Sequence, residues 1–220
     1  MPIPHTWDLT PRDAITLQKQ LAHEVDIHTP LEVTSIRYVA GVDVSVKDGI
    51  SRAAIVVMSF PELALVETAT ALRPAVFPYI SGLLSFREGP VILEAGDKLQ
   101  IAPDVFIFDG MGVMHPRRLG IAAHIGLWWD RPTVGCGKTR LIGKHAPLGE
   151  DKGAYQTVEQ AGEEIGMVLR TRSRVKPVYI SAGHRATYES ARGLIMQCVT
   201  RYRLPEPIRA AHHAAGNDQG

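Results

Sequence analysis

The sequence predicts an α/β fold in which helices flank a mixed central sheet. Three consecutive extended segments in the first third of the chain, two of them joined by a tight turn, predict an antiparallel meander. Short apolar runs that alternate with helical patterns in the rest of the chain predict parallel strands, because a parallel crossover needs a helix to return the chain. A hydrophobic content of 45% supplies enough apolar side chains for a core on the sheet.

The chain opens with an amphipathic helix and continues into the meander. Apolar positions at helical spacing predict a helix over residues 11–28, which follows Thr10 and begins at the favourable N-terminal Pro11. Lys47-Asp48-Gly49 is a tight-turn signal between two extended segments, and therefore predicts a β-hairpin. The three strands are expected over residues 37–46, 50–59 and 64–72.

The remainder of the chain alternates between helices and buried strands. Pro90 follows a stretch rich in proline and glycine, and is placed to occupy the first position of a helix that runs to about Leu99. The tail from His212 to Gly220 has no such pattern and is expected to fray. A meander that leads into strand–helix–strand units is the plan of ribonuclease H-like folds. The other expected elements are strands over 105–109, 133–137 and 178–181 and helices over 119–129 and 187–202.

Length, charge and cysteine content define the class of protein. We expect one domain over residues 1–220, because no segment has the composition of a linker. The net charge of +1 lacks the basic excess of many nucleic-acid binders, so any phosphate-binding face must be local. Two cysteines are too few for a disulfide framework, the N-terminus has no secretory signal, and no apolar run is long enough to span a bilayer. We therefore expect a cytoplasmic protein that does not contact membranes.

Three acidic residues occupy unusual places in this pattern. Asp43 lies on the small, polar face of an otherwise apolar strand, and Asp109 ends a core strand, where an unpaired carboxylate is costly. Glu88 lies just before the helix expected to begin at Pro90. Taken singly, each acid has a structural explanation as a turn partner, a strand-end cap or a favourable charge at a helix N-terminus.

The predicted fold brings these three acids together, since two neighbouring strands and the start of one helix suffice. Clustered carboxylates repel one another unless a cation lies among them, and oxygen ligands select hard cations such as Mg²⁺. The cluster therefore indicates metal-assisted hydrolysis of a phosphodiester, in which metal ions activate the attacking water and stabilise the leaving oxygen. The competing hypothesis is an α/β protein whose acids are structural and whose properties do not depend on metal.

Two glycine-rich motifs do not fit nucleotide chemistry. Gly135-Cys-Gly-Lys-Thr139 resembles the end of a phosphate-binding loop, but Pro132 stands where the first glycine of that motif must fall. Gly110-Met-Gly112 follows a strand as in a dinucleotide-binding turn, but His115 replaces the third glycine. These mismatches argue against nucleotide hydrolysis and dinucleotide binding.

Six motifs follow one another along nearly the whole chain. The long ones are Ala40-Gly-Val-Asp-Val-Ser45, Pro78-Tyr-Ile-Ser-Gly-Leu-Leu-Ser-Phe-Arg-Glu88 and Phe108-Asp-Gly-Met-Gly-Val-Met-His-Pro-Arg-Arg-Leu-Gly-Ile-Ala-Ala-His124. The shorter ones are Gly137-Lys-Thr-Arg-Leu141, Ser181-Ala-Gly-His-Arg185 and Leu204-Pro-Glu-Pro-Ile-Arg-Ala-Ala-His212. Together they resemble the endonuclease V family. The chain departs from the family pattern at Ser81 and Ala182, where proline is usual, and at Val46, where an aromatic residue is common.

The resemblance implies a ribonuclease H-like fold and a DNA repair endonuclease that recognises deaminated purines such as deoxyinosine. Such an enzyme hydrolyses the second phosphodiester bond 3′ to the lesion and leaves 3′-hydroxyl and 5′-phosphate ends. The resemblance implies Mg²⁺ as the cofactor, with Mn²⁺ able to substitute, and DNA with deaminated bases as the partner; we expect a monomer without a protein partner. By position, Asp43, Glu88 and Asp109 correspond to the metal ligands. Lys138 and His212 correspond to further catalytic residues, Lys138 stabilising charge on the scissile phosphate.

The resemblance also assigns residues that contact the substrate. An enzyme that reads a base inside a duplex must extrude it, and Tyr79 corresponds to the wedge residue that fills the gap. Gly82, Gly110 and Leu141 correspond to the hypoxanthine pocket, where glycines let backbone groups approach the base closely. His115 corresponds to a further substrate contact. Hypoxanthine carries a carbonyl where adenine has an amine, a change that backbone amides detect.

Two alternatives retain the same fold. An endoribonuclease specific for inosine would cut RNA instead, and a non-catalytic nucleic-acid-binding module would lose the chemistry; the complete acidic set with Lys138 argues against the second. The alternating basic run from Arg170 to Lys176 is expected to be a solvated hairpin face. Basic residues that could follow the phosphates are Arg117, Arg118, Arg140 and Lys144.

Overall fold

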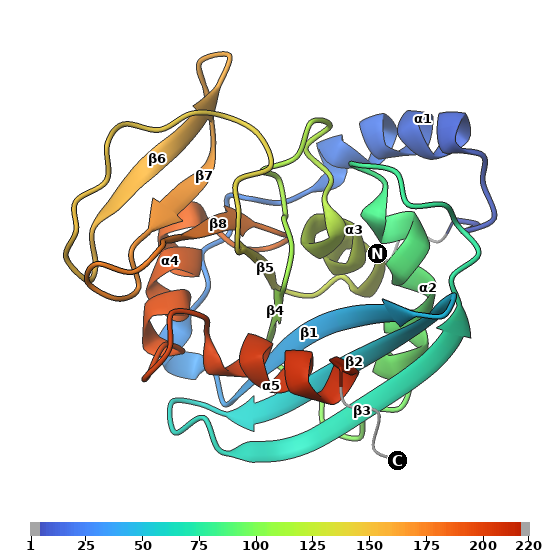
Figure 1. The fold of residues 1–220 in the computed structure, drawn as a ribbon, viewed down its shortest axis with the longest axis horizontal. Helices are drawn as coiled ribbons and strands as arrows, with labels where there is room; N and C mark the ends of the chain where they lie inside the picture. Colours follow the sequence, from blue (N-terminus) through green and yellow to red (C-terminus); the bar gives the residue numbers. More distant parts are fainter. Residues whose placement is uncertain (1–4, 217–220) are drawn as a thin grey trace.

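The computed structural model describes residues 5–216, and within that range a mixed sheet of eight strands forms the centre of the molecule (Figure 1). Its strands are β1 (Tyr38–Lys47), β2 (Ile50–Ser59), β3 (Leu65–Pro74), β4 (Val105–Phe108), β5 (Thr133–Gly137), β6 (Tyr155–Gln160), β7 (Glu163–Leu169) and β8 (Val178–Ala182). They lie side by side in the order β3-β2-β1-β4-β5-β8-β7-β6.

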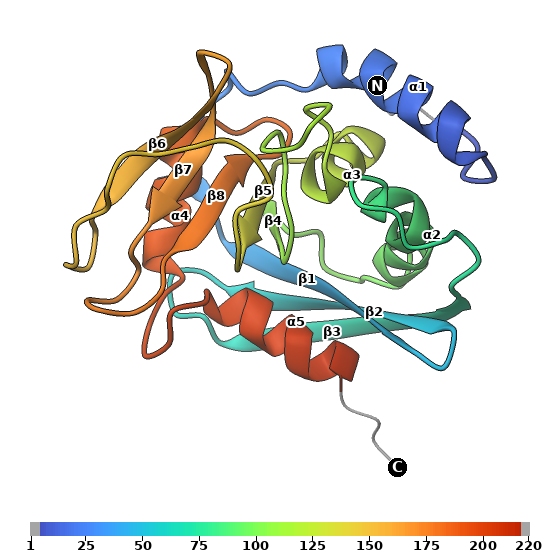
Figure 2. The same cartoon turned by 45° about the horizontal axis from the view of Figure 1, so that its top comes forward.

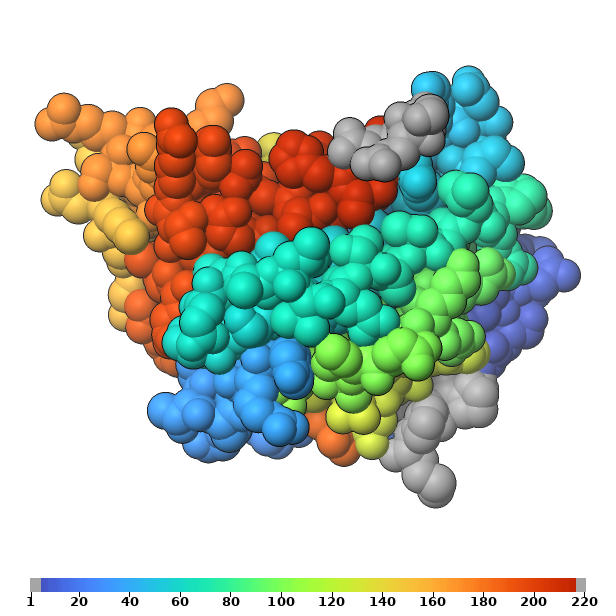
Figure 3. Space-filling view, turned by 90° about the horizontal axis from the view of Figure 1, so that it is seen from below, coloured from blue at the N-terminus to red at the C-terminus, as the bar shows by residue number. Residues whose placement is uncertain are grey.

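The first three strands form the predicted antiparallel meander. β1 pairs with β2 from Tyr38 opposite Ser59 to Lys47 opposite Ile50, and β2 pairs with β3. Asp48 and Gly49 connect β1 to β2 with φ angles of 51° and 76°, as a two-residue hairpin turn requires. β3 lies at the edge of the sheet, and its residues form a band across the surface beside the C-terminal helix (Figure 3).

The strands after the meander confirm the parallel prediction only in part. β4 pairs in parallel with β1 and with β5, whereas β8 runs antiparallel to both β5 and β7. The parallel direction expected for residues 178–181 is therefore wrong, because the chain returns to the sheet through the β6–β7 hairpin and not through a helical crossover. This hairpin was not predicted; its first strand, Tyr155–Gln160, is mostly polar and buries Val158 alone.

Residues 5–216 contain five α-helices, of which α2 to α5 pack on the sheet: α1 (Pro11–Leu21), α2 (Leu84–Gly96), α3 (Ile121–Trp129), α4 (Tyr188–Gln197) and α5 (Glu206–Gly216). α2 and α3 pack on one face of the sheet in a core that includes Phe106 and Phe108. α4 and α5 pack on the opposite face, where Val39 and Ile107 are buried, and Figure 2 shows α2 and α5 on the two sides. None of the helices in this range has the length and apolar character that crossing a membrane demands.

Several helix bounds differ from the predicted ones. α1 ends at Leu21 and continues as a short 3-10 turn to Glu24, and α4 ends at Gln197 instead of reaching Tyr202. Pro90 is not the first residue of a helix but lies inside α2, which begins at Leu84. A proline there costs a backbone hydrogen bond, about 3 kcal/mol, but the buried stripe of Phe86, Val91 and Ile92 holds the helix against the sheet.

The tail expected to fray is helical as far as Gly216. Ile208, Ala211 and Ala215 are buried on the face of α5 that contacts β1 and β2. Gly41 of β1 allows this close packing, because a Cβ atom built on it would lie 1.9 Å from the Pro207 carbonyl oxygen. Residues 217–220 lie outside the described part of the chain.

Candidate functional site

Asp43 and Asp109 lie where the central strands β4 and β5 end, beside the middle of the parallel neighbour β1. Val42 is opposite Phe108 in the parallel register, and the Asp109 amide donates to the Val42 carbonyl at 3.0 Å. Asp43 and Asp109 therefore occupy neighbouring positions on adjacent strands. Lys138 follows β5 at the same place, since the carboxyl ends of parallel strands meet there.

Asp43, Asp109 and His212 form the group that could hold a metal ion among residues 5–216. One potential ligand atom from each lies within 4.8 Å of the other two. The His212 Nδ1 atom is 2.8 Å from Asp43 Oδ2, and the Lys138 ammonium group forms an ion pair with Asp109 Oδ2. The Asp43 and Asp109 side chains are only 12% and 13% exposed, whereas His212 is 61% exposed. The cluster thus joins two partly buried carboxylates to a lysine and a histidine that are more exposed to solvent.

Glu88 lies inside α2 and not before a helix, so its predicted local context is wrong. It is not in the group of three, but its charge interacts with both aspartates. Burial, followed by repulsion from Asp43 and Asp109, raises the pKa of Glu88 to about 8. Burial and Asp109 likewise raise the pKa of Asp43, although His212 and Lys138 lower it. The acids therefore repel one another in the absence of a metal ion, and a cation among them would relieve that repulsion.

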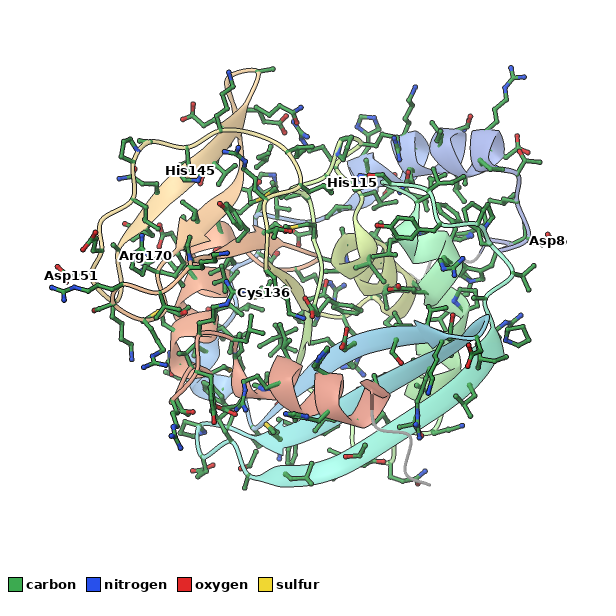
Figure 4. All side chains as sticks on the ribbon, viewed as in Figure 1. Asp8, His115, Cys136, His145, Asp151 and Arg170 are labelled. Atoms are coloured by element: carbon green, nitrogen blue, oxygen red, sulfur yellow. The ribbon has the colours of Figure 1, made fainter. Side chains whose placement is uncertain are left out.

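A cavity of about 340 Å³ adjoins this cluster. Asp109 and Lys138 line it, as do five residues that the resemblance assigned to substrate binding: Tyr79, Gly82, Gly110, His115 and Leu141. Tyr79 and Leu141 are 76% and 42% exposed, while His115 is 3% exposed and lies beside α1 (Figure 4). The structure thus brings the predicted substrate residues to the same opening as two of the predicted catalytic residues.

Two glycines shape the wall of this cavity. Gly82 has a φ angle of +79°, and a Cβ atom on it would lie 2.8 Å from an Arg117 guanidinium nitrogen. A Cβ atom on Gly110 would lie 2.7 Å from the Ile121 side chain. A larger residue at either position would therefore have to displace a neighbour, so the cavity wall depends on glycine at both.

His115 is held by protein groups at both ring nitrogens. Burial, followed by the charge of Arg117, lowers the pKa of His115 to about 4, so the ring is neutral near pH 7. Its Nδ1 accepts from the Arg117 backbone amide at 3.2 Å, and the proton therefore lies on Nε2, which donates to the Gly82 carbonyl at 3.0 Å. In this arrangement His115 supports the cavity wall.

Several basic residues proposed as phosphate contacts are engaged within the protein. Arg117 donates to Gln18 and to the Gly82 carbonyl, and Arg118 forms an ion pair with Glu163. Arg170 lies to the left of His115 in Figure 4, in the loop that joins β7 to β8. The alternating basic run therefore belongs to a loop between two antiparallel strands.

Gln18 is a cavity-lining residue that the sequence analysis missed. It is 1% exposed and lies on the buried face of α1 with Ala14 and Leu21. A signal existed, because residue 18 follows Ala14 by four positions and so falls on the apolar stripe of the predicted helix. A polar residue at a buried helical position must find hydrogen-bond partners.

Comparisons with known proteins show the same family along nearly the whole chain. The family model of endonuclease V matches residues 19–213. Endonuclease V of Trichormus variabilis is 50% identical over 216 residues, which cover 97% of each chain. The crystal structure of endonuclease V from Streptomyces avermitilis aligns with a TM-score of 0.91 at 36% identity, over 97% of this chain and 95% of that one.

A solved complex extends the comparison to a bound nucleic acid. Endonuclease V from Ciona intestinalis, in complex with a 24mer DNA containing an inosine followed by a ribo-adenosine, aligns with a TM-score of 0.80 at 26% identity. The alignment covers 93% of this chain and 95% of that one. The predicted α/β fold of ribonuclease H-like type is confirmed.

Proposed function

This chain belongs to the endonuclease V family, and from that premise we propose that it nicks DNA at the second phosphodiester bond 3′ to deoxyinosine, with Mg²⁺ as cofactor. The observation that supports the proposal most directly is the cavity that adjoins the acidic cluster. Asp109 and Lys138 line the same opening as Gly82 and Gly110, so a base bound in the cavity holds its own backbone close to the carboxylates. The products are 3′-hydroxyl and 5′-phosphate ends.

The acidic cluster fits a divalent cation. Asp43, Glu88 and Asp109 offer carboxylate oxygens, which hard cations prefer. Burial first, and then repulsion from the neighbouring acids, raises the pKa values of Asp43 and Glu88, and bound positive charge would offset both effects. A bound Mg²⁺ ion lowers the pKa of its water and stabilises charge on the phosphate oxygens, and Mn²⁺ substitutes for it. His212 lies within reach as a further residue of the site.

The basic side chains at the cluster have distinct roles in this proposal. The Lys138 ammonium group lies at the mouth of the cavity, where it stabilises negative charge on the scissile phosphate. The His212 Nδ1 atom bonds to Asp43, which orients the ring and leaves Nε2 for a water or phosphate oxygen. Both groups therefore act on the phosphate, and neither acts on the base.

The cavity itself provides the recognition of the base. Tyr79 is 76% exposed at the rim, where its ring can fill the gap left by an extruded base. The glycine-rich walls let backbone groups approach hypoxanthine, whose carbonyl replaces the amine of adenine. A volume of about 340 Å³ lies at the lower end of the range for small-ligand sites, consistent with a single base.

A cleavage assay with matched oligonucleotides tests this function. One duplex carries a single deoxyinosine, a second carries deoxyadenosine at that position, and an RNA carries inosine; each is incubated with Mg²⁺ and with EDTA. We expect a Mg²⁺-dependent nick one nucleotide beyond the deoxyinosine. Cutting of the RNA alone would reassign the protein to inosine-containing RNA, and no cutting of either nucleic acid would support a binding module.

A further inference from the structure

The Gly82 carbonyl oxygen at the cavity wall accepts hydrogen bonds from three side chains. Gln18 Nε2 donates at 3.0 Å, His115 Nε2 at 3.0 Å and a terminal nitrogen of Arg117 at 2.6 Å. A carbonyl oxygen has two lone pairs, so three donors, one of them cationic, saturate it. Among the residues that the structure describes, this carbonyl joins segments that are distant in sequence, since its donors come from α1 and from the loop before α3.

Gln18 connects these segments through both ends of its amide. Its Nε2 also donates to the Leu119 carbonyl at 3.0 Å, and its Oε1 accepts from Arg117 Nε at 2.6 Å. Because carbonyl oxygens only accept, the Nε2 group must face them, and the orientation of the amide is fixed. Gln18 is 1% exposed, so these bonds form out of contact with water, where an unmade bond is costly.

The saturated carbonyl belongs to a short segment, residues 79–83, which we call the wedge loop. The Leu83 amide donates to the Ile80 carbonyl at 2.9 Å, and Gly82 adopts a φ angle of +79°, so the loop closes as a turn. No proline lies between Pro78 and Pro90, and the glycine adds conformational freedom. Hydrogen bonds to the Gly82 carbonyl are therefore a means of restricting this loop, and Tyr79 lies three residues before it.

We propose that Gln18 and Arg117 are positioning residues that hold the wedge loop in the conformation required to extrude and accommodate a base. They need not touch the substrate. By fixing the Gly82 peptide, they keep the cavity open beside Asp109 and keep Tyr79 at its rim, so that the ordering of the loop is complete before DNA binds. The role in extrusion rests on the proposed function, whereas the restraint on the loop does not.

The test uses the full-length protein with Gln18→Met, which keeps the length and volume of the side chain but removes all three hydrogen bonds. Gln20→Met is the matched control, because Gln20 is exposed on the same helix. The first measurement is amide hydrogen exchange over residues 79–84, which needs no substrate. We expect the Leu83 amide to exchange about tenfold faster in Gln18→Met and at the original rate in Gln20→Met.

The second measurement compares a deoxyinosine paired in a duplex with one that is unpaired in a bulge. We expect kcat/KM of Gln18→Met to fall about tenfold on the duplex and to change little on the bulge, where no pairing must be broken. Arg117→Lys, which retains the charge at a half-buried position but loses the planar fork, should give the same pattern and replaces Gln18→Met if that variant does not fold.

Two results would overturn the proposal. One is hydrogen exchange in the wedge loop equal to that of the wild type; the other is an equal loss of activity on both substrates together with a lowered Tm, as a general structural defect gives. If the wild-type protein itself does not nick deoxyinosine, the proposed function fails, while the exchange measurement still decides whether Gln18 restrains the loop.

Discussion

Asp43 and Asp109 are partly buried carboxylates; the Lys138 ammonium group pairs with Asp109, and the His212 ring hydrogen-bonds to Asp43. We expect Asp43→Ala and Asp109→Ala each to reduce Mg²⁺-dependent cleavage by at least about 100-fold while DNA binding is retained, because the residues proposed to contact the base are other members of the cavity lining. Cleavage rates and a gel-shift measurement with EDTA separate the two effects. Asp151→Ala is the control, since Asp151 is exposed in the loop between β5 and β6 and lies at the left edge of Figure 4, away from Cys136 of β5. Full cleavage by Asp43→Ala would refute the metal assignment.

Tyr79 is a second residue whose substitution should change activity without changing the stability of the fold. Because its side chain is 76% exposed, Tyr79→Ala should change the free energy of unfolding by no more than about 0.5 kcal/mol. We expect it to weaken the preference for deoxyinosine over deoxyadenosine, measured as the ratio of the two kcat/KM values. Tyr79→Phe keeps the ring that stacks on bases and should keep the ratio. An unchanged ratio in Tyr79→Ala would show that the ring is not the wedge.

At the residue scale, the sequence predicted which acidic side chains lie close together, but it did not predict the buried hydrogen bonds that hold the cavity wall. Asp43 and Asp109 were expected to meet because two neighbouring strands suffice to bring them together, and they do. The proximity of His212 to this pair came from the resemblance, since its segment has no strong pattern. Gln18 was missed because its importance depends on two backbone carbonyls and one guanidinium, and only tertiary structure brings these to α1.

At the scale of elements, prediction succeeded where local signals were strong. The β1–β2 hairpin has a tight turn whose residues take the positive φ angles that Asp and Gly tolerate. β6 and α5 were missed because each buries few large side chains: Val158 in β6, and alanines beside Ile208 in α5. β7, in contrast, buries Ile165, Met167, Val168 and Leu169, and this apolar run was a signal that the sequence prediction did not use. Pro90 was misread because the usual helix-start rule considers only local sequence, whereas packing of α2 on the sheet decided where that helix begins.

The contact between α5 and β1 places His212 beside Asp43, and Gly41 makes it possible. We expect Gly41→Ala to destabilise the protein by about 1–3 kcal/mol and to reduce cleavage, because its Cβ atom would lie 1.9 Å from the Pro207 carbonyl and push α5 outward. Gly193→Ala, in helix α4, meets no atom within 4 Å and should be neutral or stabilising. Urea unfolding and cleavage rates of both variants test this, and equal behaviour would exclude the proposed role of Gly41.

At the scale of the whole molecule, the sheet separates two cores, and the site draws residues from elements on both faces. The core under α4 and α5 sets the position of His212, and the core under α2 and α3 sets those of Glu88 and the cavity. That second layer also contains two buried histidines, His115 and His124. The stability of the fold should therefore respond to pH through groups that are not part of the acidic cluster.

His124 provides the clearest test of this response. Burial, followed by the nearby His5 and His115, lowers its pKa from 6.5 to about 3, and Ser85 and His5 hydrogen-bond its two nitrogens. The unfolded chain binds the proton near pH 6.5 and the folded protein does not. The stability that the neutral His124 contributes is therefore fully present above that pH and is lost as the pH falls toward 3. Between pH 7 and 5 the loss from His124 alone is about 2 kcal/mol.

Glu88 acts in the opposite direction. Its pKa is raised from 4.5 to about 8, so the folded protein holds this proton in a range where the unfolded chain does not, and falling pH stabilises the fold through this group. The total pH dependence of the wild-type stability therefore combines two effects of opposite sign.

The measurement that isolates His124 is the difference between wild type and His124→Gln in urea unfolding at pH 7, 6 and 5. We expect the variant, whatever its stability at pH 7, to lose about 2 kcal/mol less by pH 5. Parallel curves for the two proteins would show that His124 is not the buried neutral group that its contacts imply.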